Sequence, residues 1–84
     1  MLDLCVCDAE NKLYENEMLN KNDKVKFIIS NCCVIEKVKD GYYTYFAVDL
    51  NSLKKKQLSK RKYQITFEGY EQLAQKIKGL EFYQ

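Results

Sequence analysis

Residues 24–50 contain three short, largely apolar segments separated by turn residues, and this pattern constrains the fold more than any other feature. In the first segment Val25, Phe27 and Ile29 take one face and Lys24 and Lys26 take the other, which predicts a strand. Asp40-Gly41 separates the second segment from the third and is typical of a tight hairpin turn. The pattern therefore predicts a three-stranded antiparallel meander.

The last quarter of the chain has the spacing of an amphipathic helix. Thr66 is suited to cap its first turn, and Gly69 lets the helix approach a sheet closely. Gly79 stands where the helix is expected to end. The residues expected on the apolar stripe are Tyr70, Leu73, Ala74, Ile77 and Leu80, with Leu73 and Ile77 packed against the sheet.

The remaining segments are predicted from shorter patterns. Residues 3–6 are expected to form a strand, and residues 13–19 a strand or an irregular edge, joined by a hairpin turn at 8–12. A second turn is expected at 20–23. Residues 51–62 are rich in lysine and are predicted to form a loop or one short helix. Tyr63, Ile65 and Phe67 then alternate as a short strand.

Two segments resemble parts of known small domains. The rhythm of residues 22–27, 34–38 and 41–43 is similar to the strands of SH3-like barrels, over about a third of the chain. Residues 63–73 resemble the strand and helix that follow the wing of some winged-helix DNA-binding proteins, although the strands expected earlier in the chain depart from that family. We assign the chain to neither family.

The predicted fold is a single α+β domain covering residues 1–84. It consists of an antiparallel sheet of four to six strands, with a small SH3-like barrel as an alternative, and one C-terminal amphipathic helix packed on the sheet. A chain of this length forms one domain, and its 46% apolar residues suffice for a core.

The composition argues against enzymatic activity and against a cofactor. The chain has no histidine, the most frequent general base and metal ligand, and its three glycines form no phosphate-binding loop. The four cysteines are spaced Cys-x-Cys and Cys-Cys, unlike the usual zinc pattern. On strands Cys5 and Cys7 would share a face and Cys32 and Cys33 would oppose each other, so we expect four reduced, buried, structural thiols and no metal.

Two surfaces are candidates for binding. Tyr43 and Tyr45 lie on the opposite side of their strand from Tyr42 and Phe46, so they would be exposed if the Tyr42 side faces the core. Exposed tyrosines are frequent anchors of protein interfaces, and cross-strand packing between solvated rings is the alternative. The second candidate surface would contact phosphate or an acidic partner, and consists of Lys54, Lys55, Lys56, Lys60, Arg61, Lys62 and Tyr63.

The charge distribution also points to binding. Residues 1–50 carry nine acidic and six basic side chains, whereas residues 51–84 carry three and eight, so the chain is strongly polarised. The basic segment can alternatively be a solvated connection that resists aggregation. A single arginine among the fourteen basic residues predicts little base specificity in any nucleic-acid contact.

We therefore expect a non-catalytic binding protein that occupies the surface of a protein partner. Thirteen lysines against one arginine, and 35 Lys, Asn, Ile, Tyr and Phe residues in total, indicate AT-rich coding. This composition favours a phage or mobile-element protein that inhibits a host factor, such as a nuclease defence system. The alternatives are a small nucleic-acid-binding domain that uses residues 54–63 and a subunit that assembles with a second copy of itself. With no secretion signal and no apolar stretch long enough to span a bilayer, we expect a cytoplasmic protein without membrane contact.

Overall fold

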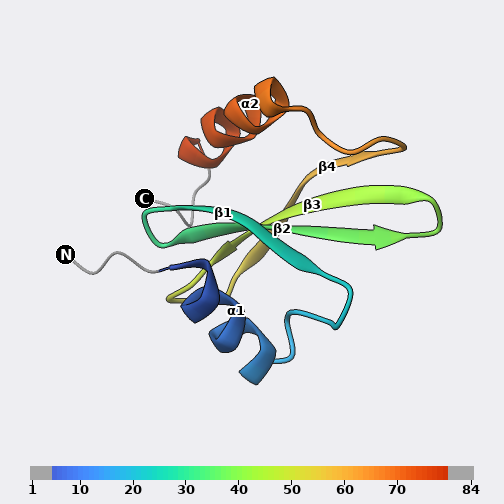
Figure 1. The fold of residues 1–84 in the computed structure, drawn as a ribbon. Helices are drawn as coiled ribbons and strands as arrows, with labels where there is room; N and C mark the ends of the chain where they lie inside the picture. Colours follow the sequence, from blue (N-terminus) through green and yellow to red (C-terminus); the bar gives the residue numbers. More distant parts are fainter. Residues whose placement is uncertain (1–4, 80–84) are drawn as a thin grey trace.

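The computed structural model describes residues 5–79 and contains one antiparallel sheet and two helices. The strands follow the order β1-β2-β3-β4, and each pairs with the next one along the chain (Figure 1). The antiparallel sheet and the C-terminal helix are confirmed, and within the described residues the sheet has four strands and is open. The elements are α1 (Val6–Glu15), β1 (Lys24–Ile29), β2 (Cys32–Lys39), β3 (Tyr42–Asp49), β4 (Lys55–Arg61) and α2 (Phe67–Lys78).

The β2–β3 hairpin forms the centre of the sheet. Its strands pair without interruption from Cys32 opposite Asp49 to Lys39 opposite Tyr42. Both turn residues have positive φ, 53° at Asp40 and 77° at Gly41. Positive φ at both central positions defines a type I′ turn, whose twist matches that of the strands. The hairpin predicted from the Asp-Gly pair is therefore confirmed.

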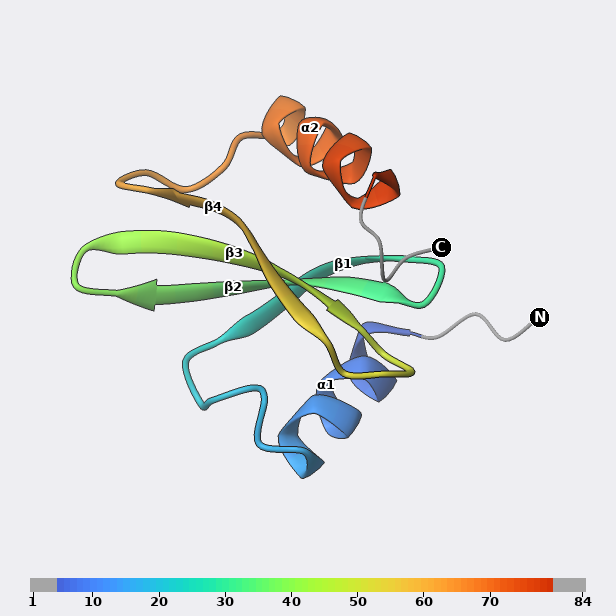
Figure 2. The same ribbon diagram turned by 180° about the vertical axis from the view of Figure 1, so that it is seen from behind.

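The two helices lie on opposite faces of the sheet (Figures 1 and 2). As a result β2 is buried on both faces, and its neighbours Val34 and Ile35 are each 0% exposed although they point in opposite directions. We call the two apolar layers the α1 cluster and the α2 cluster. The buried residues of the α1 cluster are Ala9, Leu13, Leu19, Val25, Cys33, Ile35, Val48 and Leu50. Those of the α2 cluster are Cys32, Val34, Tyr45, Ala47, Ile65, Leu73 and Ile77.

A β-bulge in β1 changes which face its side chains occupy. The register with β2 shifts between Val25 and Phe27. Val25 consequently belongs to the α1 cluster, whereas Phe27 and Ile29 pack against the α2 cluster. The prediction that Val25, Phe27 and Ile29 share one face is wrong, because the extra residue reverses the alternation.

The N-terminal part of the described chain is helical. The predicted turn at 8–12 and strand at 13–19 are wrong, and so is the predicted strand at 3–6 as far as it is described, since α1 begins at Val6. Residues 3 and 4 lie outside the described residues. Ala9 and Leu13, one helical turn apart, are buried against the sheet, and this burial stabilises a helix over a hairpin. The Cys5 thiol accepts a hydrogen bond from the backbone N–H of Asp8 and caps the first turn.

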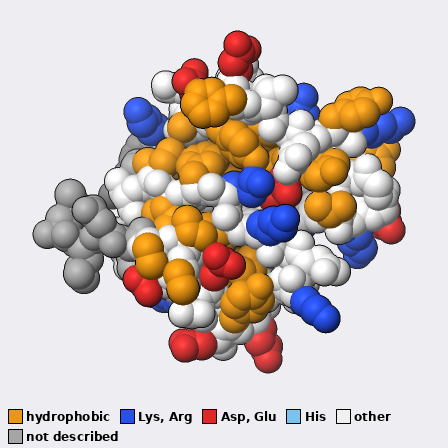
Figure 3. Space-filling model, in the orientation of Figure 1, with side chains coloured by type: hydrophobic (Ala, Val, Ile, Leu, Met, Phe, Trp, Pro, Cys, Tyr) orange, Lys and Arg blue, Asp and Glu red, His pale blue; other side chains and the backbone are white. Residues whose placement is uncertain are grey.

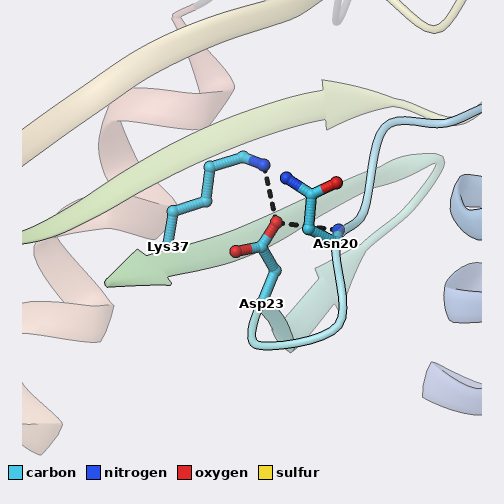
Figure 4. A network of polar contacts seen from close by, with 3 residues as sticks. All are labelled: Asn20, Asp23 and Lys37. Carbon is cyan, nitrogen blue, oxygen red and sulfur yellow. Dashed lines mark hydrogen bonds and ion pairs between the residues drawn. The ribbon is translucent and has the colours of Figure 1, made fainter. Parts of the chain in front are cut away.

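A polar contact holds the segment between α1 and β1 against the sheet (Figure 4). The buried carboxylate of Asp23 accepts hydrogen bonds from the backbone N–H of Asn20 at 2.9 Å and from Lys37 Nζ at 2.6 Å. Lys37 lies on β2, so the ion pair joins the start of β1 to the neighbouring strand. The turn predicted at 20–23 closes through this carboxylate.

Helix α2 follows the prediction closely. The Thr66 hydroxyl accepts a hydrogen bond from the N–H of Gly69, and α2 ends at a C-cap on Gly79. Leu73 is 3% exposed and Ile77 is 0% exposed, so both pack against the sheet as predicted. Leu80, the last residue of the predicted stripe, lies outside the described residues. The short strand predicted over Tyr63, Ile65 and Phe67 is wrong, because Ile65 lies in the connection and Phe67 is the first residue of α2.

Gly69 is required because the helix passes very close to the chain that precedes it. A methyl group at Gly69 would overlap Cγ2 of the Ile65 side chain, which is buried in the α2 cluster. In an unobstructed helix alanine is more favourable than glycine by about 1 kcal/mol. Here the overlap should reverse the sign, and overpacking of this kind typically costs about 1–3 kcal/mol.

We predict that Gly69→Ala lowers the free energy of unfolding by about 1–3 kcal/mol, measured by urea denaturation followed by circular dichroism. Gly79→Ala is the matched control, because a methyl group there would meet only Lys76 O, at 3.6 Å. The control should leave stability unchanged or raise it by up to about 1 kcal/mol. Equal effects of the two substitutions would contradict this account of Gly69.

Candidate functional site

The basic segment forms an edge strand of the sheet. Residues 55–61 pair with β3 as β4, so the prediction of a loop or short helix at 51–62 is wrong for this part. Lysine, glutamine and serine have low strand propensity, but pairing with a central strand overrides propensity. Lys54 precedes the strand and Lys62 follows it, and all six basic side chains are exposed.

A second β-bulge sorts the basic side chains of β4 between the two faces of the sheet. The register with β3 shifts between Tyr45 and Phe46, and Leu58 is the extra residue on β4. Lys55 and Lys60 consequently lie on the α1 side, although an odd spacing would separate them on a regular strand. Lys56 and Arg61 lie on the α2 side, opposite Ala47 and Tyr43.

On the α1 side each of these two lysines covers an aromatic ring of β3. Lys55 Nζ lies 4.8 Å from the centre of the Phe46 ring, and Lys60 Nζ lies 5.0 Å from the centre of the Tyr42 ring. Such cation–π contacts contribute about 0.5–1 kcal/mol at exposed sites. Tyr42 and Phe46 are half-buried and belong to neither apolar cluster. We call these four residues the lysine–aromatic face.

Tyr43 and Tyr45 do not form an exposed pair. Tyr45 is 0% exposed and part of the α2 cluster, so the prediction that it is a surface anchor is wrong. Tyr43 is half-buried and packs against the same cluster. The prediction assumed that one face of β3 meets solvent, whereas helices cover both faces and α2 lies over this one.

The Tyr45 hydroxyl instead joins the sheet to the start of α2. It donates a hydrogen bond to Glu36 Oε2 at 2.6 Å and accepts one from the N–H of Ile65 at 3.1 Å. Gln64 Nε2 also donates to the Glu36 carboxylate, which is only 4% exposed. Burial, followed by the hydrogen bond to Glu36, raises the pKa of Tyr45 well above its ordinary value. This network fixes the path of the connection between β4 and α2.

Large apolar side chains are exposed near the end of β2, in the β4–α2 connection and at the start of α2. Val38 is 51% exposed, Tyr63 78% and Phe67 81%. Val38 is the cross-strand partner of Tyr43, which in turn pairs with Arg61, two residues before Tyr63. Hydrophobic side chains gather beside lysine or arginine at this end of the molecule, near the β2–β3 hairpin and the β4–α2 connection (Figure 3). We call Val38, Tyr43 and Tyr63, together with Phe67 at the start of α2, the apolar end.

The sequence predicts Tyr63 as a site residue but not Val38 or Phe67. It places Val38 on a strand without indicating which face its side chain occupies, and it places Phe67 on a strand that the structure does not contain. The sequence contains one signal for Phe67. Thr66 as the helix cap makes Phe67 the first helical residue, which lies before Tyr70, the first residue of the predicted apolar stripe.

The cysteines divide into a buried pair and an exposed pair. Cys32 and Cys33 are buried on opposite faces of β2, and burial raises the pKa of Cys32 to about 11 and that of Cys33 to about 12. Cys5 and Cys7 are exposed at the start of α1, so the prediction of buried strand thiols is wrong for them. Between residues 5 and 79 no three Cys, Asp or Glu side chains gather in a way that could hold a metal ion.

We predict that only two thiols of the folded protein react with iodoacetamide at pH 8. Cys5 and Cys7 are accessible, whereas Cys32 and Cys33 are buried and remain protonated at that pH. Mass spectrometry should show two adducts before unfolding and four afterwards. Native mass spectrometry should show the mass of the polypeptide alone, and a stoichiometric zinc adduct would contradict the expectation of structural thiols.

We predict that Tyr45→Phe lowers the free energy of unfolding by about 1–3 kcal/mol at pH 7, because two buried partners lose a hydrogen bond. Tyr43→Phe is the control, since the hydroxyl of this half-buried residue makes no such bond within residues 5–79, and should change stability by less than about 0.5 kcal/mol. The raised pKa means that folding favours the neutral Tyr45 hydroxyl, so its contribution is complete below the ordinary pKa of about 10 and is lost at higher pH. The difference between the parent and Tyr45→Phe should therefore shrink as the pH rises above about 10.

Comparisons with known proteins do not assign a role to the lysine–aromatic face or to the apolar end, so both surfaces are interpreted from their geometry. No helix within residues 5–79 is long and apolar enough to cross a membrane. No protein-family model, curated protein or solved structure matches the chain.

Proposed function

We propose that this chain is a non-catalytic protein that acts by binding another protein, and that the apolar end is its contact surface. The observation that carries the proposal is the exposure of two large rings, 78% at Tyr63 and 81% at Phe67. Burying such rings against a partner removes a large apolar area from water and favours association.

The composition of the apolar end supports this proposal. Tyrosine, phenylalanine and arginine are enriched in protein interfaces, and Arg61 and Lys62 directly precede Tyr63 in the chain. The network around Tyr45 holds the β4–α2 connection in place, so the rings are presented by an ordered backbone. Preorganisation of this kind reduces the entropy lost on binding. The basic neighbours favour a partner whose surface is acidic around an apolar centre.

The proposal includes the origin and the partner class expected from the composition. A small, lysine-rich, AT-coded protein without histidine fits a cytoplasmic phage or mobile-element product that blocks a host factor, such as a nuclease defence system. Inhibition by surface occupation needs no catalytic group. It requires only that the contact surface bind more tightly than the natural ligand of the host factor.

We predict that the double substitution Tyr63→Ala and Phe67→Ala abolishes partner capture from a nuclease-treated lysate of a low-GC bacterium. Against the purified partner, the loss of two anchors should weaken binding at least about 30-fold, chiefly through faster dissociation. Surface plasmon resonance provides both rates.

Tyr14→Ala is the matched control, because this ring is 43% exposed but lies on α1. The control should bind like the parent protein, and thermal unfolding should confirm that all variants are folded. Parent-like binding by the double variant would overturn the proposal, as would loss of the captured protein on nuclease treatment alone.

A further inference from the structure

We propose that the lysine–aromatic face is a second binding site, which takes single-stranded nucleic acid. The site consists of Tyr42 and Phe46 on β3 with Lys55 and Lys60 on β4. It lies on the α1 side of the sheet, and the proposed protein contact lies on the α2 side and at the β4–α2 connection. The two proposals therefore stand or fall separately.

The face is available because α1 covers only part of its side of the sheet. In Figure 2, α1 lies below one half of the sheet, and the β2–β3 hairpin extends beyond it on the left. Val48 and Leu50, near the end of β3, are packed in the α1 cluster. Phe46 and Tyr42, earlier on the same strand and the same face, are only half-buried and are covered by lysine.

The charge of this face suits a polyanion. Lys55 and Lys60 form no ion pair, since the salt bridge that the described chain contains joins Lys37 to Asp23. Their β4 neighbour on the same face is the uncharged Gln57, opposite Phe46. Asp23 also lies on this side of the sheet, where it pairs with Lys37, the cross-strand partner of Thr44. Within the described residues no carboxylate forms an ion pair with Lys55 or Lys60, so each can pair with a phosphate.

The rings favour a single strand over a duplex. Bases stack on exposed aromatic faces only when they are unpaired, whereas a duplex offers phosphates but no free base faces. Stacking of a base is worth more than the exposed cation–π contact that it would displace. Each lysine can therefore move from its ring to a phosphate while a base takes its place. Lysine lacks the planar fork of arginine, and stacking accepts any base, so the site should show little sequence preference.

The first test measures binding affinity by fluorescence anisotropy. The labelled ligands are an oligothymidylate of 20 nucleotides, a duplex of equal length and polyglutamate. The single strand should bind most tightly, with an affinity that falls as salt rises. The slope of log affinity against log salt is about −0.7 per phosphate contact for single strands. The double variant Lys55→Ala and Lys60→Ala should flatten that slope by about 1.4.

The matched control is Lys56→Ala with Arg61→Ala. It removes the same charge from the same strand but from the α2 side. It should change the slope by less than half as much. Equal flattening by the two double variants would overturn the proposal, because binding would then follow the total charge rather than this face. Polyglutamate binding as tight as that of the single strand would also overturn it, in favour of an acidic protein partner.

The second test concerns the rings. Tyr42→Leu and Phe46→Leu keep an apolar side chain and the charge, so each should weaken oligothymidylate binding about 5- to 100-fold without changing the salt slope. Phe67→Leu is the control on the opposite side and should have no effect. Circular dichroism identifies any ring variant that does not fold, and the lysine pair decides the question in that case. Either of two results would refute the proposed site. One is that the ring variants fold and bind like the parent protein. The other is that the parent protein does not bind the single strand at 50 mM salt.

Discussion

Both faces of the sheet must be covered by two short helices, and the rest of the structure depends on this constraint. The five residues Cys32 to Glu36 on β2 are all buried in succession, which requires an apolar layer on each side. α1 has 10 residues and α2 has 12, so each helix is about 15–18 Å long. The eight residues of β2 or β3 extend over about 26 Å. Each helix therefore leaves part of its face uncovered, and the two candidate surfaces lie where coverage ends.

The buried polar groups follow from the same constraint. Glu36 is the last of the buried residues of β2, and its carboxylate must find donors there because water does not reach it. Tyr45 and Gln64 provide them, and the Tyr45 hydroxyl also accepts the N–H of Ile65. The hydrogen bonds that compensate the carboxylate thus also set the position of the β4–α2 connection. The exposed rings of Tyr63 and Phe67 are placed by this internal requirement.

The sequence contained most of the information on the sheet but little on its faces. The β2–β3 hairpin and the capped helix α2 were predictable, because Asp40-Gly41 and Thr66 act through local backbone geometry. The bulges at Lys26 and Leu58 were not, since an inserted residue is defined only by the partner strand. One bulge sends Val25 and Phe27 to different clusters, and the other places Lys60 on the same side as Lys55.

The two remaining errors have a related cause. The region of α1 is predicted as the end of a strand, a hairpin turn and the start of a second strand or irregular edge, although the Ala9 and Leu13 spacing is helical. β4 was predicted as a loop because its residues have low strand propensity, and its pairing with β3 is a long-range effect. The burial of Tyr45 has another cause, because α2 itself covers this residue. The sequence predicts α2 but does not show which face of β3 the helix covers.

The lysines of β4 also protect an edge strand, and this role must be weighed against binding. Charged side chains along an edge discourage pairing with other chains wherever they point. Protection alone would therefore be satisfied by a regular strand, with Lys55 and Lys60 on opposite faces. The bulge at Leu58 instead brings both ammonium groups to one face, at 4.8 and 5.0 Å from two rings that no apolar cluster covers.

Part of this arrangement has a packing explanation, because the same bulge lets Leu58 pack against the α2 cluster. Packing of Leu58 does not account for two aromatic residues, Tyr42 and Phe46, at the positions that the lysines cover. Serine or threonine would serve at those half-exposed strand positions. Two aromatic rings, each beside an ammonium group, are what a site for stacked bases and phosphates requires.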